Sequence, residues 1–142
     1  MYTVLVPVDT DEARARSQAR FVAGLPGAAD EVEATVLFVF DDDADRPEEL
    51  QRFKSADRIG SVRRCVDLLE AAGVTVTTMD DSGDPARTIV SAADELAPDL
   101  LVLGGRKRSP VGKAIFGSIA QSVILNTDHP VVVTGVDAEE RT

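Results

Sequence analysis

Short apolar runs alternate along the chain with segments of helical periodicity, and this alternation constrains the fold more than any other feature. The apolar runs are short and rich in β-branched residues, which predicts strands at Tyr2–Val8, Glu33–Phe40, Val74–Met79, Asp99–Leu103 and Pro130–Thr134. The intervening segments predict helices at Asp11–Leu25, within Glu48–Ala72, at Pro85–Leu96 and at Gly117–Asn126. The order β-α-β-α-β-α-β-α-β predicts one α/β domain over residues 1–142. We expect an open five-stranded, mostly parallel sheet, doubly wound with four helices.

The predicted second helix carries an apolar stripe that ends before Gly73. Ile59, Val62, Val66 and Leu69 recur at the spacing of one helix face. Cys65, the one cysteine of the chain, lies beside this stripe, so we expect it in the core.

The composition excludes several classes of protein. With one cysteine and one histidine, His129, the chain has neither a disulfide framework nor a cysteine- or histidine-based metal site. No apolar run reaches the roughly 18 residues that span a bilayer, and the N-terminus lacks the charged region of a signal peptide. We therefore expect a cytoplasmic protein without a membrane partner.

The net charge of −10 disfavours nucleic acid as a partner, because an acidic surface repels phosphates. Only three of the 15 basic residues are lysines, and aspartates outnumber glutamates. This balance resembles that of halophilic proteins, whose carboxylates hold water in salt-rich cytoplasm. The halophilic interpretation is preferred, and the alternative is an ordinary acidic protein from a GC-rich genome. The acidic run that begins at Asp41 is expected to be a solvated loop.

The stretch after the fourth strand is positively charged, unlike the chain as a whole. No acidic residue occurs from Leu100 to Thr127, although 25 of 142 residues are acidic, and four basic residues fall there. Glycines recur in the same stretch, which leads into the start of a helix near Gly117 and Ser118. Glycines let the backbone approach a ligand closely, and a helix start offers free N–H groups and the positive end of the helix dipole. These features together predict a phosphate site. The alternative is a solvated basic loop whose glycines only make turns.

Asp9, at the end of the first strand, is the second candidate. Ligands of such folds bind at the carboxyl ends of the strands, where the strand order reverses. There Asp9 would accept hydrogen bonds from a ribose hydroxyl or an adenine amine, or it would cap the next helix. We expect it to be the only carboxylate close to the site. Neither the Walker spacing nor the dinucleotide-binding glycine pattern is present, which argues against a P-loop NTPase or a dehydrogenase.

Several segments together resemble the universal stress protein family, in its small single-domain form, over nearly the whole chain. The matching segments are Val4–Asp9, Val36–Val39, Gly83–Pro85, Pro98–Gly104 and His129–Val133. The resemblance implies a Rossmann-like fold of the adenine nucleotide alpha hydrolase type. It also implies a homodimer formed through the last strand, whose short apolar edge would invite pairing with a second chain.

Family members that bind ATP share the pattern Gly-x2-Gly-x9-Gly-Ser/Thr after the fourth strand. Gly104, Gly117 and Ser118 match this pattern, and Lys107 replaces the second glycine. A lysine there would either block the pocket or place its ammonium on a phosphate. The resemblance implies that ATP or a related adenine nucleotide, with or without Mg²⁺, binds at Pro7, Val8, Asp9, Val39, Gly104, Arg106, Lys107, Ser109, Gly117 and Ser118.

We therefore expect a nucleotide-binding stress-response module. Efficient catalysis is not expected, since no histidine or carboxylate pair is predicted near the loop to activate water. Two alternatives remain open. One is a dimeric interaction protein whose basic loop contacts an acidic partner, and the other is an adenylate-processing enzyme of the same fold.

Overall fold

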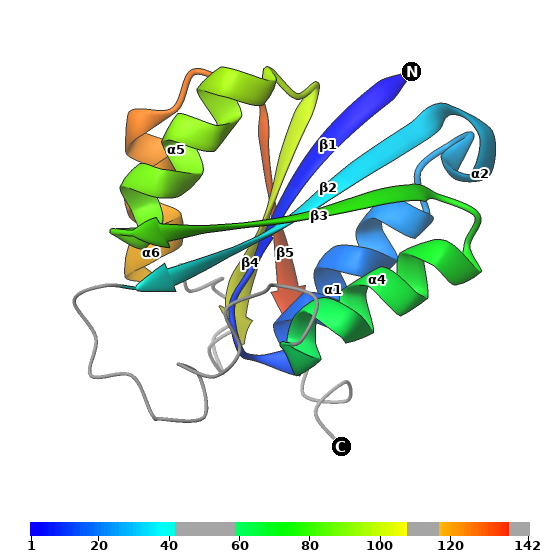
Figure 1. The fold of residues 1–142 in the computed structure, drawn as a ribbon, viewed down its shortest axis with the longest axis horizontal. Coiled ribbons are helices and arrows are strands. Elements are labelled where there is room, and N and C mark those ends of the chain that lie inside the picture. Colours follow the sequence, from blue (N-terminus) through cyan, green and yellow to red (C-terminus); the bar gives the residue numbers. More distant parts are fainter. Residues whose placement is uncertain (42–58, 108–116, 137–142) are drawn as a thin grey trace.

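The computed structural model describes residues 1–41, 59–107 and 117–136, which form one five-stranded sheet between two layers of helices (Figure 1). The strand order is β3-β2-β1-β4-β5, and every pair of neighbours is parallel. The strands are β1 Tyr2–Val8, β2 Val32–Asp41, β3 Thr75–Gly83, β4 Leu100–Lys107 and β5 Val131–Val136. The predicted doubly wound α/β fold is thereby confirmed.

The helices lie on both faces of the sheet. Their bounds are α1 Glu12–Ala23, α2 Ala28–Glu31, α4 Gly60–Ala71, α5 Pro85–Leu96 and α6 Ser118–Asn126. Helices α1 and α4 cover one face, and α5 and α6 cover the other (Figure 1). The one-turn helix α2 was not expected, because four residues are too few to show a helical period. The predicted segment Glu48–Ala72 lies outside the described residues up to position 58.

Local signals set the helix ends. The side chain of Asp11 accepts a hydrogen bond from the Arg14 N–H at 3.1 Å, so Asp11 rather than Asp9 caps α1. Asp84 caps α5 in the same way, with Pro85 in the first turn. Gly73 follows α4 with a φ of +82°, a left-handed conformation that glycine adopts without strain.

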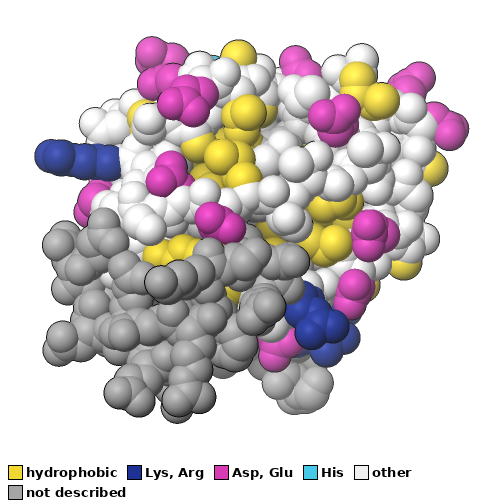
Figure 2. Space-filling view, in the orientation of Figure 1, with side chains coloured by type: hydrophobic (Ala, Val, Ile, Leu, Met, Phe, Trp, Pro, Cys, Tyr) yellow, Lys and Arg dark blue, Asp and Glu magenta, His cyan; other side chains and the backbone are white. Residues whose placement is uncertain are grey.

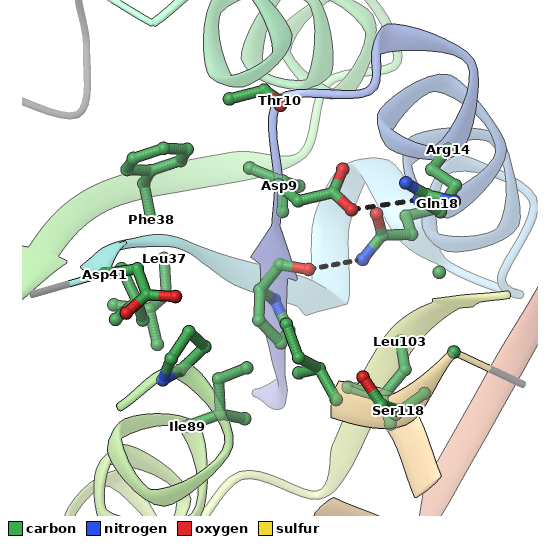
Figure 3. Close-up of a pocket in the computed structure, with 18 of the residues that line it drawn as sticks. Asp9, Thr10, Arg14, Gln18, Leu37, Phe38, Asp41, Ile89, Leu103 and Ser118 are labelled. Atoms are coloured by element: carbon green, nitrogen blue, oxygen red, sulfur yellow. Dashed lines mark hydrogen bonds and ion pairs between the residues drawn. The ribbon is translucent and has the colours of Figure 1, made fainter. Parts of the chain in front are cut away.

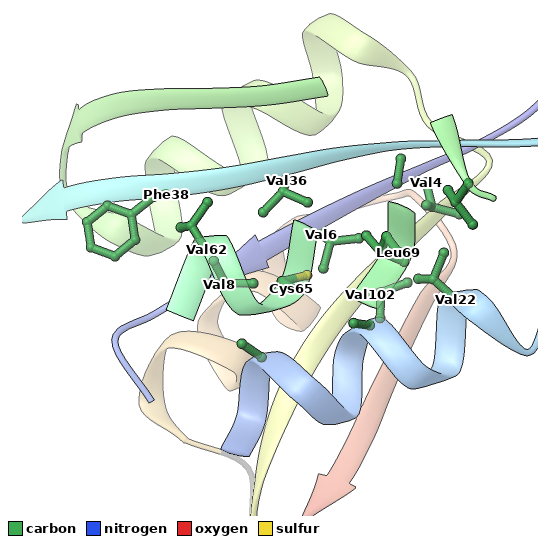
Figure 4. Close-up of a cluster of buried hydrophobic side chains, with 14 of the residues drawn as sticks. Val4, Val6, Val8, Val22, Val36, Phe38, Val62, Cys65, Leu69 and Val102 are labelled. Atoms are coloured by element: carbon green, nitrogen blue, oxygen red, sulfur yellow. The ribbon is translucent and has the colours of Figure 1, made fainter. Parts of the chain in front are cut away.

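Each face of the sheet has its own apolar core. Between the sheet and helices α1 and α4, Val6, Val36, Val62 and Leu69 are buried, with Cys65 among them (Figure 4). The core between the sheet and helices α5 and α6 contains the strand residues Leu5, Leu37 and Leu101, with Ile89 of α5 and Val123 of α6 packed against them. Because both faces are covered, successive residues of the central strands are apolar, as at Val4–Val6 in β1 and Leu100–Leu103 in β4.

Four strands end beyond the residue that their apolar pattern predicted: β2 at Asp41 and β5 at Val136 by one or two residues, and β3 and β4 by more. Strand β3 continues through Asp80–Gly83 and β4 through Gly104–Lys107. These extensions are polar or glycine-rich, and backbone pairing with the neighbouring strand keeps them in the sheet. Part of the expected loop after Leu103 is therefore strand.

Acidic side chains predominate on the face shown in Figure 2, as the net charge leads one to expect. Within the described ranges, the helices are all too short or too polar to traverse a lipid bilayer.

Candidate functional site

A cavity of about 380 Å³ opens at the carboxyl ends of β1, β2 and β4. Its remaining walls come from the first turns of α1, α5 and α6. The strand order reverses at this point, since β1 and β4 adjoin while their chain neighbours lie on opposite sides. The cavity therefore occupies the position where ligands bind in open α/β sheets.

Most of the predicted site residues line this cavity (Figure 3). They are Pro7, Val8, Asp9, Val39, Gly104, Gly117 and Ser118. Arg106 and Lys107 continue the backbone of β4, but their side chains are outside what the structure describes. Ser109 also lies outside the described residues.

Asp9 is held by two neighbours on the first turn of α1. Its Oδ1 accepts a hydrogen bond from the Asp11 N–H at 2.9 Å, and its Oδ2 accepts one from Arg14 Nε at 3.0 Å. The carboxylate is half exposed, at 51%. Each oxygen has a second lone pair, so Asp9 can still accept a hydrogen bond from a ligand hydroxyl.

The backbone of Asp9 is fixed as well. The hydroxyl of Ser61, buried in the first turn of α4, donates a hydrogen bond to the Asp9 carbonyl oxygen. Residues of α1 and α4, which are far apart in the sequence, thus both hold the residue that follows β1.

Gln18 lies at the base of the cavity, where β1 and β4 separate. These strands pair only at Val4 with Leu100 and Leu5 with Leu101. Beyond that point Gln18 Nε2 donates to the carbonyl oxygen of Pro7 at 2.6 Å (Figure 3). It also donates to the carbonyl oxygen of Val102 at 3.0 Å. Its side chain is 1% exposed. Gln18 therefore bridges β1 and β4 by hydrogen bonds where the two strands no longer pair with each other.

Sequence reasoning missed Gln18, although a signal existed. Ala15, Ala19 and Val22 form the buried stripe of α1, and position 18 falls on the same stripe. A polar residue on a buried helix face needs a hydrogen-bond partner, so an amide there predicts a backbone contact with the sheet.

Gly104 allows α1 to approach the end of β4. A Cβ atom at position 104 would lie 3.0 Å from Gln18 Oε1 and 3.2 Å from Arg14 Cδ. The first glycine of the phosphate pattern is thus needed for packing against two residues that line the cavity.

The opposite side of the cavity is largely apolar. Leu37, Val39 and Ile89 line it, and Phe38 packs edge-on against Phe40 with ring centroids 4.9 Å apart. Such a surface suits a flat aromatic ring.

Asp41, at the end of β2, also lines the cavity (Figure 3). The expectation that Asp9 would be the only nearby carboxylate is therefore wrong. The sequence placed Asp41 at the start of an acidic loop, whereas β2 extends to include it.

The start of α6 contributes Gly117 and Ser118 to the cavity wall. Gly117 is the N-cap, and no side chain accepts a hydrogen bond from the first N–H groups of this helix among the described residues. The first turn also has no acidic residue. These N–H groups are donors for an anion.

Two other residues singled out in the sequence lie away from the cavity. His129 Nε2 is 3.2 Å from Asp94 Oδ1 and joins the segment before β5 to α5. Cys65 is buried, and burial raises the pKa of its thiol from 9.0 to about 12. In the part of the chain that the structure describes, no cluster of three acidic, histidine or cysteine side chains could hold a metal ion.

Comparison with known proteins gives a consistent picture. The profile of the Universal stress protein family matches residues 1–135. A universal stress protein of Mycolicibacterium smegmatis is 36% identical over 76 residues, which are 53% of this chain and 58% of that protein. The chain matches less than two thirds of the length of each curated relative.

Two solved structures from Archaeoglobus fulgidus have the same fold. A universal stress protein is 28% identical with a TM-score of 0.74, covering 94% of this chain and 98% of that one. A universal stress protein in complex with dAMP is 23% identical with a TM-score of 0.70, covering 94% and 98% of the two chains.

Proposed function

Since the chain belongs to the universal stress protein family, we propose that the cavity at its strand ends binds ATP or a related adenine nucleotide. One observation carries the proposal. The cavity brings together an apolar slot, the carboxylate of Asp9 at the end of β1, and a helix start at Gly117 and Ser118 that has no side-chain cap. The three parts match the base, the sugar and the phosphates of a nucleotide. The dAMP complex of the similar archaeal protein supports the same ligand class.

Each part of the ligand has proposed partners. The adenine ring lies in the apolar slot beside the backbone of Val39, and a ribose hydroxyl donates to Asp9. The phosphates accept hydrogen bonds from the backbone near Gly104 and from the start of α6. Of the other predicted contacts, Arg106, Lys107 and Ser109 would add donors to the phosphates.

We further propose that this is a cytoplasmic stress-response module that binds nucleotide without efficient turnover. No histidine is among the described residues that line the cavity, and the remaining acceptor sites of Asp9 are proposed to hold a ribose hydroxyl rather than a water molecule. Any Mg²⁺ would be bound by the phosphates of the nucleotide. Phosphate release measured over many turnovers tests this, and sustained release would favour the enzyme alternative.

Calorimetric titration with ATP and with AMP, in high salt with Mg²⁺, tests the binding site. Ser118→Asp places a carboxylate in the first turn of α6, which the helix dipole tolerates but a phosphate does not. We expect nucleotide affinity to fall at least about tenfold. Ser91→Asp, on the exposed side of α5, is the matched control and should bind as the native protein does. Equal affinity in both variants would contradict the assigned phosphate position.

The role of Lys107 is tested in the same experiment. If Lys107→Gly binds nucleotide and the native protein does not, the lysine blocks the pocket. The result would then favour the alternative of a dimeric interaction protein whose basic loop contacts an acidic partner. If the native protein and Lys107→Gly both fail to bind, the proposed function is wrong.

We also propose a homodimer in which β5 pairs with its copy. Strand β5 is at the edge of the sheet, and Leu125 on the neighbouring helix α6 is 74% exposed. Sedimentation equilibrium tests this: a mass that stays at 15.1 kDa at micromolar concentration would contradict it.

A further inference from the structure

We propose that Arg14 recognises the phosphate next to the ribose and so makes the cavity select nucleotides over nucleosides. This inference rests on the proposed function, because it assigns a specificity-determining residue to the same cavity.

Arg14 lies between the two parts of the site that a ribose phosphate would bridge. Its Nε is 3.0 Å from Asp9 Oδ2 (Figure 3), and its Nη2 is 3.5 Å from Asp11 Oδ2. On the other side, its Cδ would be 3.2 Å from a Cβ atom at position 104. The arginine therefore contacts both the proposed ribose carboxylate and the glycine that begins the phosphate pattern.

The guanidinium is held in place but retains donors for a ligand. The side chain is 23% exposed, and the two ion pairs fix its orientation over the first turn of α1. Those pairs engage Nε and Nη2. Among the described residues no contact engages Nη1, which carries two of the five N–H donors. A fork of this kind suits a phosphate oxygen.

The charge of the cavity makes such a residue necessary. Asp9 and Asp41 line the cavity, and Arg14 is the one cation among its described lining side chains. The protein as a whole has a net charge of −10. Without Arg14, a phosphate bonded to the ribose would lie beside the Asp9 carboxylate without its ion-pair partner, in a partly enclosed space where Coulomb repulsion is stronger than in water.

The position of Arg14 indicates which phosphate it contacts. The first phosphate is bonded to the ribose, and Arg14 contacts the carboxylate proposed to bind that ribose. In Figure 3, Asp41 and Ile89 lie on the other side of the cavity from Arg14, so the arginine is away from the proposed base slot. Its contribution should therefore be equal for AMP and ATP, and absent for adenosine.

Calorimetric titration of the native protein and Arg14→Gln with adenosine, AMP and ATP tests this. We expect the Kd for AMP and for ATP to rise by about tenfold or more, as for loss of a charge-assisted hydrogen bond. The Kd for adenosine should stay within about twofold. Arg63→Gln removes the same charge from an exposed position on α4 outside the cavity and should leave all three affinities unchanged.

Arg14→Lys serves as the second variant, because it keeps the charge but loses the fork. It should bind AMP with an affinity between those of the native protein and Arg14→Gln. Thermal unfolding of each variant shows that it is folded.

Other outcomes would overturn the inference. If Arg14→Gln loses affinity equally for adenosine and AMP, Arg14 only orients Asp9. If this variant gains affinity for either ligand, the arginine competes with the ligand for the Asp9 carboxylate. If the native protein binds none of the three ligands, the proposed function fails, and this inference fails with it.

Discussion

Replacing Gln18 with methionine should destabilise the protein because Gln18 satisfies two carbonyl groups where strands β1 and β4 separate. Methionine is close to glutamine in length and volume, so Gln18→Met creates little empty space. It removes the hydrogen bonds of 2.6 Å to Pro7 and 3.0 Å to Val102. Both acceptors lie in buried residues, and leaving a buried carbonyl unsatisfied costs about 1–3 kcal/mol. We expect a total loss of about 3 kcal/mol, which corresponds to a fall in Tm of about 10 °C.

Urea unfolding gives the free energy directly, as a lower midpoint with an unchanged slope. The matched control is Gln121→Met, on the exposed surface of α6, which should change stability by less than about 0.5 kcal/mol. A loss below about 1 kcal/mol for Gln18→Met would refute the reasoning, since it would mean that other donors satisfy both carbonyl groups.

The remaining predictions concern two residues outside the cavity, Cys65 and Gly105. Burial raises the pKa of Cys65 to about 12, so the thiol of the native protein should resist alkylation by iodoacetamide at pH 8. It should react once the protein is unfolded in urea. Rapid alkylation of the native protein would contradict this prediction. The raised pKa favours the protonated thiol in the folded state, so stability should be lost as the pH rises from 9.0 towards 12, by about 1.4 kcal/mol per unit. Gly105→Ala would place a Cβ atom 2.7 Å from the Thr134 carbonyl oxygen and should cost about 2 kcal/mol in chemical denaturation. Gly60→Ala meets open space, so an equal loss in both variants would argue against the steric explanation.

The strands and helices were predictable because their pattern is local. Helix α5 runs from Pro85 to Leu96 as predicted, since a capping aspartate, a proline in the first turn and an apolar stripe all lie within one segment. Strand ends were predicted less well. Residues Gly104–Lys107 carry no apolar pattern, and only pairing with β5 makes them strand.

The sequence by itself determined the fold class, both cores and the edge of the sheet where Asp9 ends a strand. These follow from periodicity and from residue types at element ends, which report burial one segment at a time. Tertiary structure alone decided which side chains meet there. Gln18 contacts Val102, which is 84 residues away in the chain, and β2 brings Asp41 to the same cavity. No pattern within one segment predicts these contacts, because they depend on where the parallel strands separate and how closely α1 packs on Gly104.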